Sequence, residues 1–549
     1  MPTLTWVGKD KVVNHHLDVP FRVLQRENHF DAPDGTPANS TDNRIIHGDN
    51  LAALKSLLPE FEGKINCIYI DPPYNTGNES WVYNDAVNDP KIKKWLGQVV
   101  GKEGEDLSRH DKWLCMMYPR LKLLHRLLAT NGAVFISIDD NEQANLKLIC
   151  DEIFGAGNFI TNIIWRSSDA SNNDSKQFST DYNHTLLYSK TIGWESNKLE
   201  RIEENNAHYK NPDNDPNGAW FSGNLSSPNP RPNLTFDIVA PNGNIIKPPK
   251  NGWRWRKERM DEMIERKEVI FSDNQTRIIK KTYLKNQSGI VPSNIWWDID
   301  DTGHNRNAKY ELIKIFDEFK TSDIFKTPKP SKFIEKVLKI SCNKNSIVLD
   351  SFAGSGTTAH AVLKLNAQDQ GNRRFILIEM EDYADTITAE RVRRVMSGYG
   401  VGTKQSAGLG GSFDYYTIGA AIFNADDTLN EAVGVDVIRD YVSYSEGIAT
   451  EYRTPQNKRE TMTASPSKDW QSCTYTPYLL GLSPETAWIF YYEADAVTCL
   501  DLDFLGTLKF GANKPATAII YADKCLFNKE FLTKHGLIFK KIPRDITRF

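Results

Sequence analysis

The stretch Ile65–Gly77, INCIYIDPPYNTG, ends an apolar run on a carboxylate and two prolines. A short apolar segment bounded by helix and strand breakers is typical of a buried strand of a parallel sheet, here residues 65–70. Open α/β sheets bind ligands at the carboxyl ends of their strands, so Asp71 lies where a ligand is expected. The prolines stiffen the turn and remove two backbone donors.

The residues of this turn together suit a planar base that carries an exocyclic amine. The Asp71 carboxylate and the Pro72 carbonyl can each accept one N–H of the amine, while Tyr74 stacks on the ring. Pro73 completes the rigid turn. The alternative is that Asp-Pro-Pro only stops a strand, and the rest of the chain decides between these two interpretations.

Length and composition restrict the class of protein. A chain of 549 residues is too long for one core, and two to four domains are expected. The net charge of −4 means that any surface for nucleic acid must be locally basic. Seven cysteines without a C-x-x-C pair indicate a reduced, cytosolic protein without structural zinc, and we expect no metal. With no apolar leader or long uncharged apolar run, we also expect no membrane span.

Strand and helix patterns alternate in two separate parts of the chain, 41–195 and 326–400. Such alternation predicts a doubly wound α/β fold. The polar residues 1–40 are expected to form an N-terminal arm, and 401–549, which begin with a Gly-rich linker, a C-terminal α+β domain without an assigned role. Residues 196–325, rich in Asn, Pro and Gly, break the pattern and form an insert between the two halves.

A second carboxylate, Asp49, lies between a short strand and an amphipathic helix over 51–61. The strand at 65–70 follows directly, which makes a strand–helix–strand unit. Asp49 and Asp71 are therefore expected on the same edge of the sheet. The alternative role for Asp49 is that of a helix N-cap.

The insert contains a basic and aromatic segment, residues 245–285, with twelve basic and six acidic residues. Trp253 and Trp255 lie among the charges. Basic groups with aromatic rings between them fit contacts to phosphates and unstacked bases, although 256–268 alone also fits a solvated helix face. The candidates for DNA contact are Lys250, Arg254, Arg256, Lys257, Lys280 and Lys281.

A glycine loop follows the buried strand at 346–350. Gly354, Gly356 and the acid Glu379, at the end of the next strand, formally match a dinucleotide fingerprint, in which Glu379 can accept both hydroxyls of a ribose. No Lys follows the second glycine, which excludes a P-loop. Asp350 would repel a pyrophosphate, but it suits an ammonium or sulfonium group. The loop therefore favours S-adenosylmethionine over NAD.

The two motifs resemble those of DNA amino-methyltransferases. Their order, with Asp71-Pro-Pro-Tyr74 before Phe352-x-Gly-x-Gly356, resembles the β class, and DPPYNTG is similar to modification (Mod) subunits of type III restriction systems. The resemblance implies a circularly permuted Rossmann-like methyltransferase sheet on which both motifs meet at one edge, and a target recognition domain in the insert. It implies cofactor contacts from Asp49, Lys329, Asp350, Phe352, Ala353, Gly354, Ser355, Gly356, Thr357 and Glu379.

The resemblance also implies an activity and partners. In this family an Asp at the first motif position goes with adenine N6, so Asp71 indicates a DNA adenine-N6 methyltransferase that acts on a flipped base. Double-stranded DNA, a homodimer and a restriction (helicase-nuclease) subunit are the implied partners, in a bacterial or archaeal cytoplasm. The alternatives are cytosine-N4 methylation, a DNA-recognition subunit without turnover and, more distantly, NAD-dependent oxidoreduction.

Overall fold

The computed structural model describes residues 3–76, 107–318, 324–402, 405–454, 477–510 and 515–544. The chain divides into two compact units. The larger unit comprises Met1–Glu195 and Asn294–Phe549, and the smaller comprises Ser196–Ser293. Each unit has an apolar core of its own.

Over the described residues, the main sheet of the larger unit has ten strands. From β17 to β4 neighbouring strands run parallel, whereas β1 and β6 run antiparallel to their neighbours. This arrangement confirms the predicted α/β class. In spatial order the strands are β1 (Arg22–Asp31), β17 (Ser412–Ala421), β2 (Asn43–His47), β14 (Arg374–Glu379), β13 (Ile347–Asp350), β3 (Ile65–Ile70), β4 (Leu128–Ile138), β6 (Tyr182–Ser189), β5 (Phe159–Arg166) and β12 (Ile295–Trp296).

The centre of the sheet joins strands that are far apart in the sequence. Val348 of β13 pairs with Cys67 of β3, and Leu349 pairs with Ile68. The consecutive strands β2 and β3 are not neighbours, because β14 and β13 lie between them. The carboxyl ends of β3 and β13 therefore lie side by side, as the two motifs require.

Helices cover both faces of this sheet. On one face α3 and α6 share an apolar core with β3, β4, β13 and β14. On the other face Phe333 of α13 contacts Tyr69 of β3. Because β3 is covered on both sides, its apolar run is nearly continuous. The helices of the larger unit up to residue 400 are α1 (Lys9–Val12), α2 (His15–Asp18), α3 (Asn50–Phe61), α6 (Leu107–Leu127), α7 (Gln143–Cys150), α10 (Ile299–Thr302), α11 (Asn305–Ile315), α13 (Ser331–Ser341), α14 (Thr357–Asp369) and α15 (Glu390–Ser397).

The main sheet extends beyond the two predicted α/β halves. Strand β1, from the predicted arm, pairs antiparallel with β17, from the predicted C-terminal domain. The boundary at residue 400 is therefore too early. Gly408, Gly410 and Gly411, directly before β17, are packed and do not form a free linker, since a Cβ on Gly410 would lie 1.7 Å from the Pro37 carbonyl oxygen.

The smaller unit is built on a three-stranded antiparallel sheet with the order β10-β11-β7. Trp253, Met260 and Met263 are buried in its core. The insert predicted over 196–325 ends earlier than expected, because β12 pairs with β5 and returns the chain to the larger unit. The elements are β7 (Trp220–Gly223), β8 (Ile238–Val239), β9 (Ile245–Ile246), β10 (Val269–Phe271), β11 (Ile278–Tyr283), α8 (Glu203–Asn206) and α9 (Lys257–Glu265).

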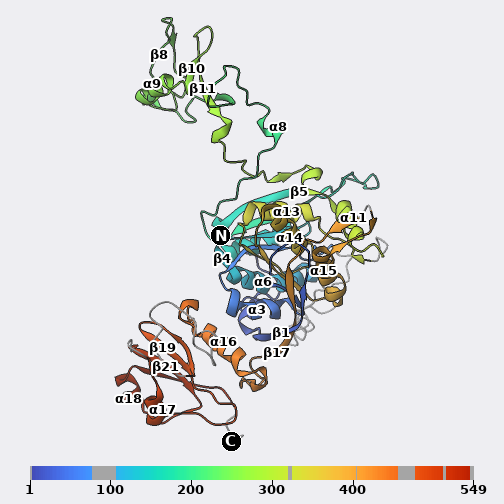
Figure 1. The fold of residues 1–549 in the computed structure, drawn as a ribbon, viewed down its shortest axis with the longest axis vertical. Helices are drawn as coiled ribbons and strands as arrows, with labels where there is room; N and C mark the ends of the chain where they lie inside the picture. Colours follow the sequence, from blue (N-terminus) through green and yellow to red (C-terminus); the bar gives the residue numbers. More distant parts are fainter. Residues whose placement is uncertain are drawn as a thin grey trace. The chain divides into compact units, whose positions relative to one another are not determined.

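The C-terminal part of the larger unit carries a second sheet, with the order β18-β19-β21-β23 (Figure 1). Its last three strands are parallel and are joined through short helices. In the part of the chain that the structure describes, no helix has the length and apolar character of a membrane span. The elements are α16 (Val435–Ser445), β18 (Leu479–Leu482), β19 (Thr486–Phe490), β20 (Cys499–Leu500), α17 (Leu502–Thr507), β21 (Thr517–Ala522), β22 (Lys524–Cys525), α18 (Lys529–Lys534) and β23 (Leu537–Lys541).

Candidate active site

The turn after β3 holds its carboxylate in a fixed orientation. Oδ1 of Asp71 accepts a hydrogen bond from the Tyr74 hydroxyl at 2.9 Å, and Oδ2 pairs with Nζ of Lys329 at 2.5 Å. The same ammonium donates to the Tyr74 hydroxyl oxygen at 3.0 Å. Carboxylate, phenol and ammonium thus form one closed set of contacts.

Residues outside the motif support this turn from behind. The indole Nε1 of Trp113 donates to the Pro73 carbonyl at 2.7 Å. Asn75 lies in the left-handed region, with φ 56°, and its amide donates to the buried carboxylate of Glu142. Glu142 also contacts Nδ1 of His110 at 2.5 Å. The turn is therefore rigid before any ligand binds.

The glycine loop after Asp350 is closely packed against another segment of the larger unit, at Thr388. Gly356 has φ 77° at the start of α14, and a Cβ there would lie 2.9 Å from the Thr388 carbonyl oxygen. The backbone N–H of Gly354 donates to Glu379 at 2.7 Å. Glycine at position 356 is thus required by the fold itself, whatever the loop binds.

Asp350, at the end of β13, is a buried carboxylate. It accepts hydrogen bonds from the Thr358 hydroxyl at 2.5 Å and from the Phe352 N–H at 3.1 Å. Burial raises the pKa of Asp350 to about 7, although these two hydrogen bonds favour the charged form; the nearby charges of Asp71 and Glu379 raise it further. A cation placed beside this group would favour its ionised form.

Both motifs line one cavity of about 320 Å³. Among the described residues, none donates a hydrogen bond to the Pro72 carbonyl, which is therefore available to a ligand. Residues that had been predicted for the site and that line the cavity are Asp71, Pro72, Pro73, Tyr74, Lys329, Asp350, Phe352, Ala353, Gly354, Ser355 and Thr357.

The cavity wall also contains residues that the motifs do not include. Glu381 lines it, and its Oε1 atom is buried without a hydrogen-bond partner among the residues that the structure describes. Phe325 and Tyr383 line it as well, with ring centroids 5.5 Å apart at 85°. Glu381 is two residues beyond Glu379, and that spacing was the available signal, because alternate residues at a strand end share a side.

Two of the predicted cofactor residues make other contacts in this structure. Asp49 is the N-cap of α3, where its Oδ1 accepts from the Ala52 N–H at 2.6 Å. The Glu379 carboxylate accepts three backbone N–H groups, from Gly354, Met380 and Glu381. The alternative role of Asp49 is thus the observed one, and contacts of either carboxylate to a cofactor stay predictions.

A family model described as DNA methylase matches residues 65–390, which begin with β3 and include both motifs. The chain belongs to the DNA methylase family. The family predicted by the resemblance is thereby confirmed.

Curated relatives of this methylase are named as restriction-modification proteins. The chain is 34% identical to the type III StyLTI Mod subunit of Salmonella typhimurium and 30% identical to the type III EcoP15I Mod subunit of Escherichia coli. These matches cover 64% and 69% of this chain, but only 57% and 64% of the relatives. It is also 30% identical to the type II methyltransferase M.KpnI of Klebsiella pneumoniae, over 63% of this chain and 82% of that protein.

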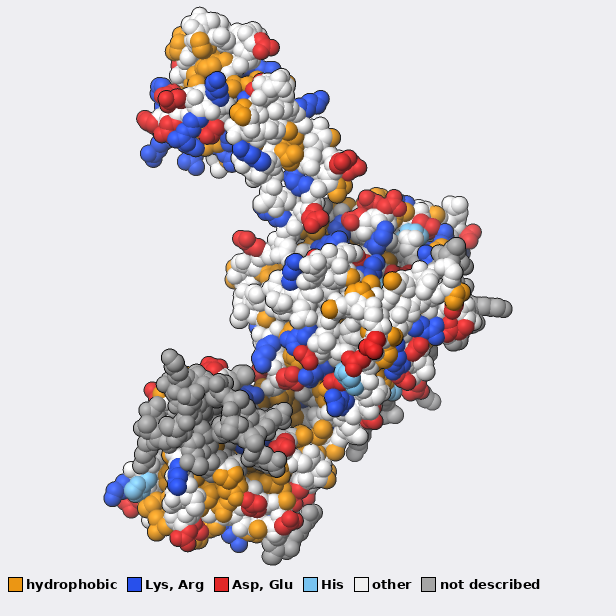
Figure 2. All heavy atoms as spheres, viewed as in Figure 1, with side chains coloured by type: hydrophobic (Ala, Val, Ile, Leu, Met, Phe, Trp, Pro, Cys, Tyr) orange, Lys and Arg blue, Asp and Glu red, His pale blue; other side chains and the backbone are white. Residues whose placement is uncertain are grey.

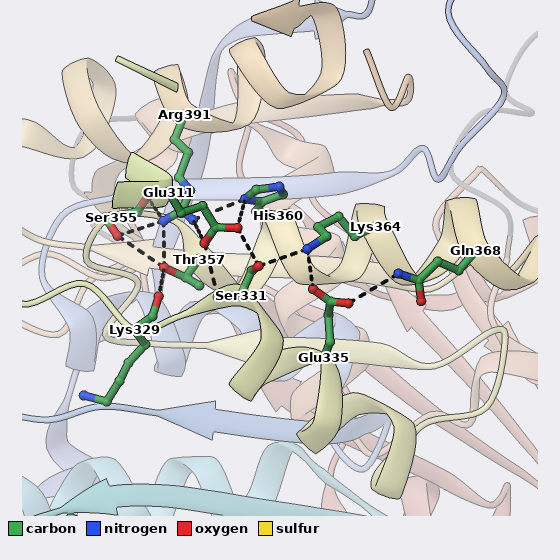
Figure 3. A network of polar contacts seen from close by, with 10 residues as sticks. All are labelled: Glu311, Lys329, Ser331, Glu335, Ser355, Thr357, His360, Lys364, Gln368 and Arg391. Carbon is green, nitrogen blue, oxygen red and sulfur yellow. Dashed lines mark hydrogen bonds and ion pairs between the residues drawn. The ribbon is translucent and has the colours of Figure 1, made fainter. Parts of the chain in front are cut away.

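A buried polar network holds the glycine loop that follows Asp350 (Figure 3). Arg391 donates to the hydroxyls of Ser355 at 3.0 Å and Thr357 at 2.7 Å. Its other nitrogen donates to Glu311 at 3.2 Å and to Nδ1 of His360 at 3.2 Å. Burial lowers the pKa of His360 to about 3, so the imidazole is neutral and can accept this hydrogen bond. Sequence reasoning missed this network, because each of its charges is distant from the loop in the chain.

The predicted DNA-binding residues lie in the smaller unit, where basic and acidic side chains are interspersed on the face shown in Figure 2. Lys250, Arg254 and Arg256 are exposed. The half-buried ring of Trp255 has two cations close to it, with Nζ of Lys280 at 4.4 Å and the guanidinium of Arg254 at 5.7 Å from the ring centroid. These residues form a combined aromatic and cationic surface.

Lys281 does not belong to that surface, which corrects the prediction. Its side chain is 3% exposed, and its ammonium pairs with Asp213 and Asp215. Lys280 and Lys281 are neighbours on β11, so their side chains point to opposite faces of the sheet. Lys257 is exposed but is paired with Asp261 at 2.8 Å.

Metal ligands were not expected from the sequence. Within the described ranges, no group of three or more His, Cys, Asp or Glu side chains is arranged to hold a metal ion.

Proposed function

We propose that this protein is a site-specific DNA methyltransferase that transfers a methyl group from S-adenosylmethionine to N6 of an adenine flipped out of duplex DNA. One observation carries the proposal: Asp71 and the loop after Asp350 line the same cavity, because β3 and β13 are neighbours. A group that could accept the N–H of an amine and a carboxylate suited to a cation would therefore share one small space. Asp at position 71 favours adenine by the family resemblance.

The side chains of the cavity fit S-adenosylmethionine. This cofactor supplies an electrophilic methyl group on a sulfonium centre when bound. Asp350 would face the positively charged part of the cofactor, because a buried carboxylate without a cationic partner is stabilised by an added cation. Glu381, with an unpartnered buried oxygen, would accept hydroxyl or amine hydrogen bonds. Phe325 and Tyr383 would provide apolar contacts to a purine ring.

The turn after β3 would activate the target amine. An aromatic amine is a poor nucleophile because its lone pair is delocalised into the ring. By accepting one N–H each, Asp71 and the Pro72 carbonyl would favour a tetrahedral nitrogen with a usable lone pair. Tyr74 would stack on the extruded base, which offsets about 1–3 kcal/mol of the energy needed to flip it.

The smaller unit would bind the DNA duplex as a target recognition domain. Lys250, Arg254 and Arg256 are exposed and can reach phosphates, and Trp255 with Lys280 can contact a base or a sugar. We further propose a homodimer that assembles with a restriction subunit in the cytoplasm, since two relatives of this chain are Mod subunits of type III restriction-modification enzymes.

The test is methyl transfer from labelled S-adenosylmethionine to duplex DNA, followed by digestion to nucleosides. We expect N6-methyladenine, no product from Asp71→Ala, and unchanged cofactor binding by that variant. Asp140→Ala, an exposed acid at the same edge of the sheet, is the matched control and should retain activity.

Two results would contradict the proposal. If the product were N4-methylcytosine, the protein would be a cytosine-N4 methyltransferase. DNA binding without any transfer, under conditions where the cofactor is bound, would identify a recognition subunit. Sequencing that detects modified bases, on DNA from cells that express the chain, would then give the target site.

A further inference from the structure

Lys329 contacts both motifs of the site. Its side-chain ammonium contacts the Asp71 turn, and its backbone carbonyl contacts the glycine loop. Its Nζ lies 2.5 Å from Oδ2 of Asp71, 3.0 Å from the Tyr74 hydroxyl oxygen and 5.1 Å from the Tyr74 ring centroid. Its backbone carbonyl accepts a hydrogen bond from the hydroxyl of Thr357 at 3.2 Å. Thr357 lies in the glycine loop after Asp350, which is called the cofactor loop below because it is proposed to hold the cofactor. The side chain is 9% exposed. The residue thus connects the cofactor loop to the catalytic carboxylate.

The backbone of Lys329 is held by the same network that holds the cofactor loop (Figure 3). Arg391 donates to Thr357 and also to Glu311. Glu311 in turn accepts the Ser331 hydroxyl at 2.6 Å, two residues beyond Lys329. Figure 3 shows the Lys329 side chain extending away from this network. The backbone of Lys329 is therefore held in place, and its ammonium extends from there to Asp71.

The groups described below around Asp71 are acids or neutral phenols, and the Lys329 ammonium supplies the positive charge beside them. Asp350 and Glu381 line the same cavity, and Asp139 lies at the end of the neighbouring strand β4. Tyr69 from β3 and Tyr74 are neutral phenols, because burial raises the pKa of each. Of the described cationic side chains, Lys329 alone forms an ion pair with Asp71.

The ammonium also occupies the place that the proposed chemistry gives to the target amine. Both groups donate N–H to Asp71, and both lie against the ring of Tyr74. The two cannot use the same oxygen of Asp71 in the same geometry at once. An amine that takes this position would therefore displace Lys329.

We infer that Lys329 is a positioning residue for the methyl-transfer site: it keeps Asp71 oriented beside the cofactor loop, and it gives up its place to the amine of the flipped base. This inference rests on the proposed function. It assigns to the lysine a role toward the base, whereas the motif alone suggested contact with the cofactor.

The experiment measures kcat and KM for DNA, at saturating cofactor, in the wild type, Lys329→Met and Lys329→Arg. Without the ammonium, no described cation holds Oδ2 of Asp71, and the carboxylate can turn away from the amine. We expect kcat of Lys329→Met to fall roughly tenfold or more. Lys329→Arg should return kcat to within about threefold of the wild type, because a guanidinium can donate to the same oxygen.

Two further measurements separate this role from others. The Kd of Lys329→Met for the cofactor should stay within about threefold of the wild type, and its KM for DNA should not rise. Lys332→Met is the matched control, since Lys332 lies three residues further along the chain, at the start of α13, with its ammonium on the exposed Asp300 carbonyl, and its kcat should equal that of the wild type. The Kd also verifies that each variant is folded around the cofactor site.

Other outcomes overturn the inference. A loss of kcat in Lys329→Met that Lys329→Arg does not restore would indicate a purely structural role. A Kd for the cofactor that weakens as much as kcat/KM would return Lys329 to the cofactor site, and a proportional rise in KM would make it a DNA contact. If the wild type itself transfers no methyl group, it is the proposed function that fails.

Discussion

Each unit of the molecule buries a charge, but the two charges have very different surroundings. In the larger unit Asp350 has two hydrogen-bond donors and, among the described residues, no ion pair with a cation. In the smaller unit Lys281 pairs with Asp213 and Asp215, and its hydrogen bond is the main reason why the pKa of Asp215 lies well below its usual range. The second charge is compensated within the chain, and the first is not.

The difference separates charges that serve stability from charges that serve binding. A buried ion pair whose partners are all present is completed when the protein folds. A buried carboxylate that faces a cavity destabilises its own ionised form, and it gains a partner only when a cation arrives. The two units should therefore respond in opposite ways when the buried charge is removed.

The largest effect is expected from Lys281→Met. The change leaves two carboxylates without their cation, and we expect a loss of about 3 kcal/mol in stability, the lower end for a broken buried pair because water can reach Asp213. Chemical denaturation with hydrogen exchange over residues 196–293 measures the loss. Lys280→Met, on the neighbouring but half-exposed position, is the control. If the two variants were equally stable, Lys281 would not be a charge that serves stability.

Asp350→Asn should have the opposite profile. The amide keeps a similar shape without a buried charge, so at pH 8 the free variant should be at least as stable as the wild type. Its affinity for S-adenosylmethionine should fall by about 10- to 100-fold, the loss of one charged hydrogen bond. Calorimetric titration and thermal unfolding on the same samples measure both. A variant that binds normally but unfolds early would place Asp350 with the structural charges.

The affinity for the cofactor should also depend on pH through Asp350. Its pKa in the free protein is raised to about 7, so its contribution to folding is largest below its ordinary value near 4 and is lost as the pH rises through 7. A cation binds the ionised form of Asp350. The affinity for the cofactor should therefore increase with pH below pH 7, by at most about tenfold for each pH unit, and should stay constant above pH 7. Titrations between pH 5.5 and 7.5 check this, and Asp350→Asn should give a flatter curve.

The smallest effect is expected at the exposed pair of Lys257 and Asp261, four residues apart on α9. Lys257→Met should change the stability by less than about 0.5 kcal/mol, since water screens both charges. It should nevertheless lower the salt dependence of DNA binding by about one unit of the log–log slope if Lys257 contacts a phosphate. Binding titrations at several salt concentrations measure this slope, and an unchanged slope would leave the lysine as a solvated surface group.

Local patterns were sufficient to predict the strands and turns that form the site. The apolar runs before Asp71 and Asp350 each end in a carboxylate, and both carboxylates line the cavity. That the two strands are neighbours followed from the family resemblance, because periodicity carries no information on which distant strands pair.

The remaining features depend on contacts between residues far apart in the chain. Lys281 looked like a phosphate ligand because Asp213 and Asp215, its partners, lie 68 and 66 residues before it. Strand β17 looked like part of a separate domain because its partner β1 is near the start of the chain. Arg391 and Glu311 have no motif at all, and only the folded chain brings them to the cofactor loop.

The order of strands in the main sheet ties the active site to the progress of protein synthesis. The ribosome produces β2 and β3 early, yet the two strands that must lie between them, β13 and β14, come from residues 347–379. A nascent chain shorter than this carries the complete catalytic turn beside an open gap in the sheet, with unpaired strand edges on both sides. The proposed methyl transfer should therefore appear only after the second half of the sheet has been made and inserted.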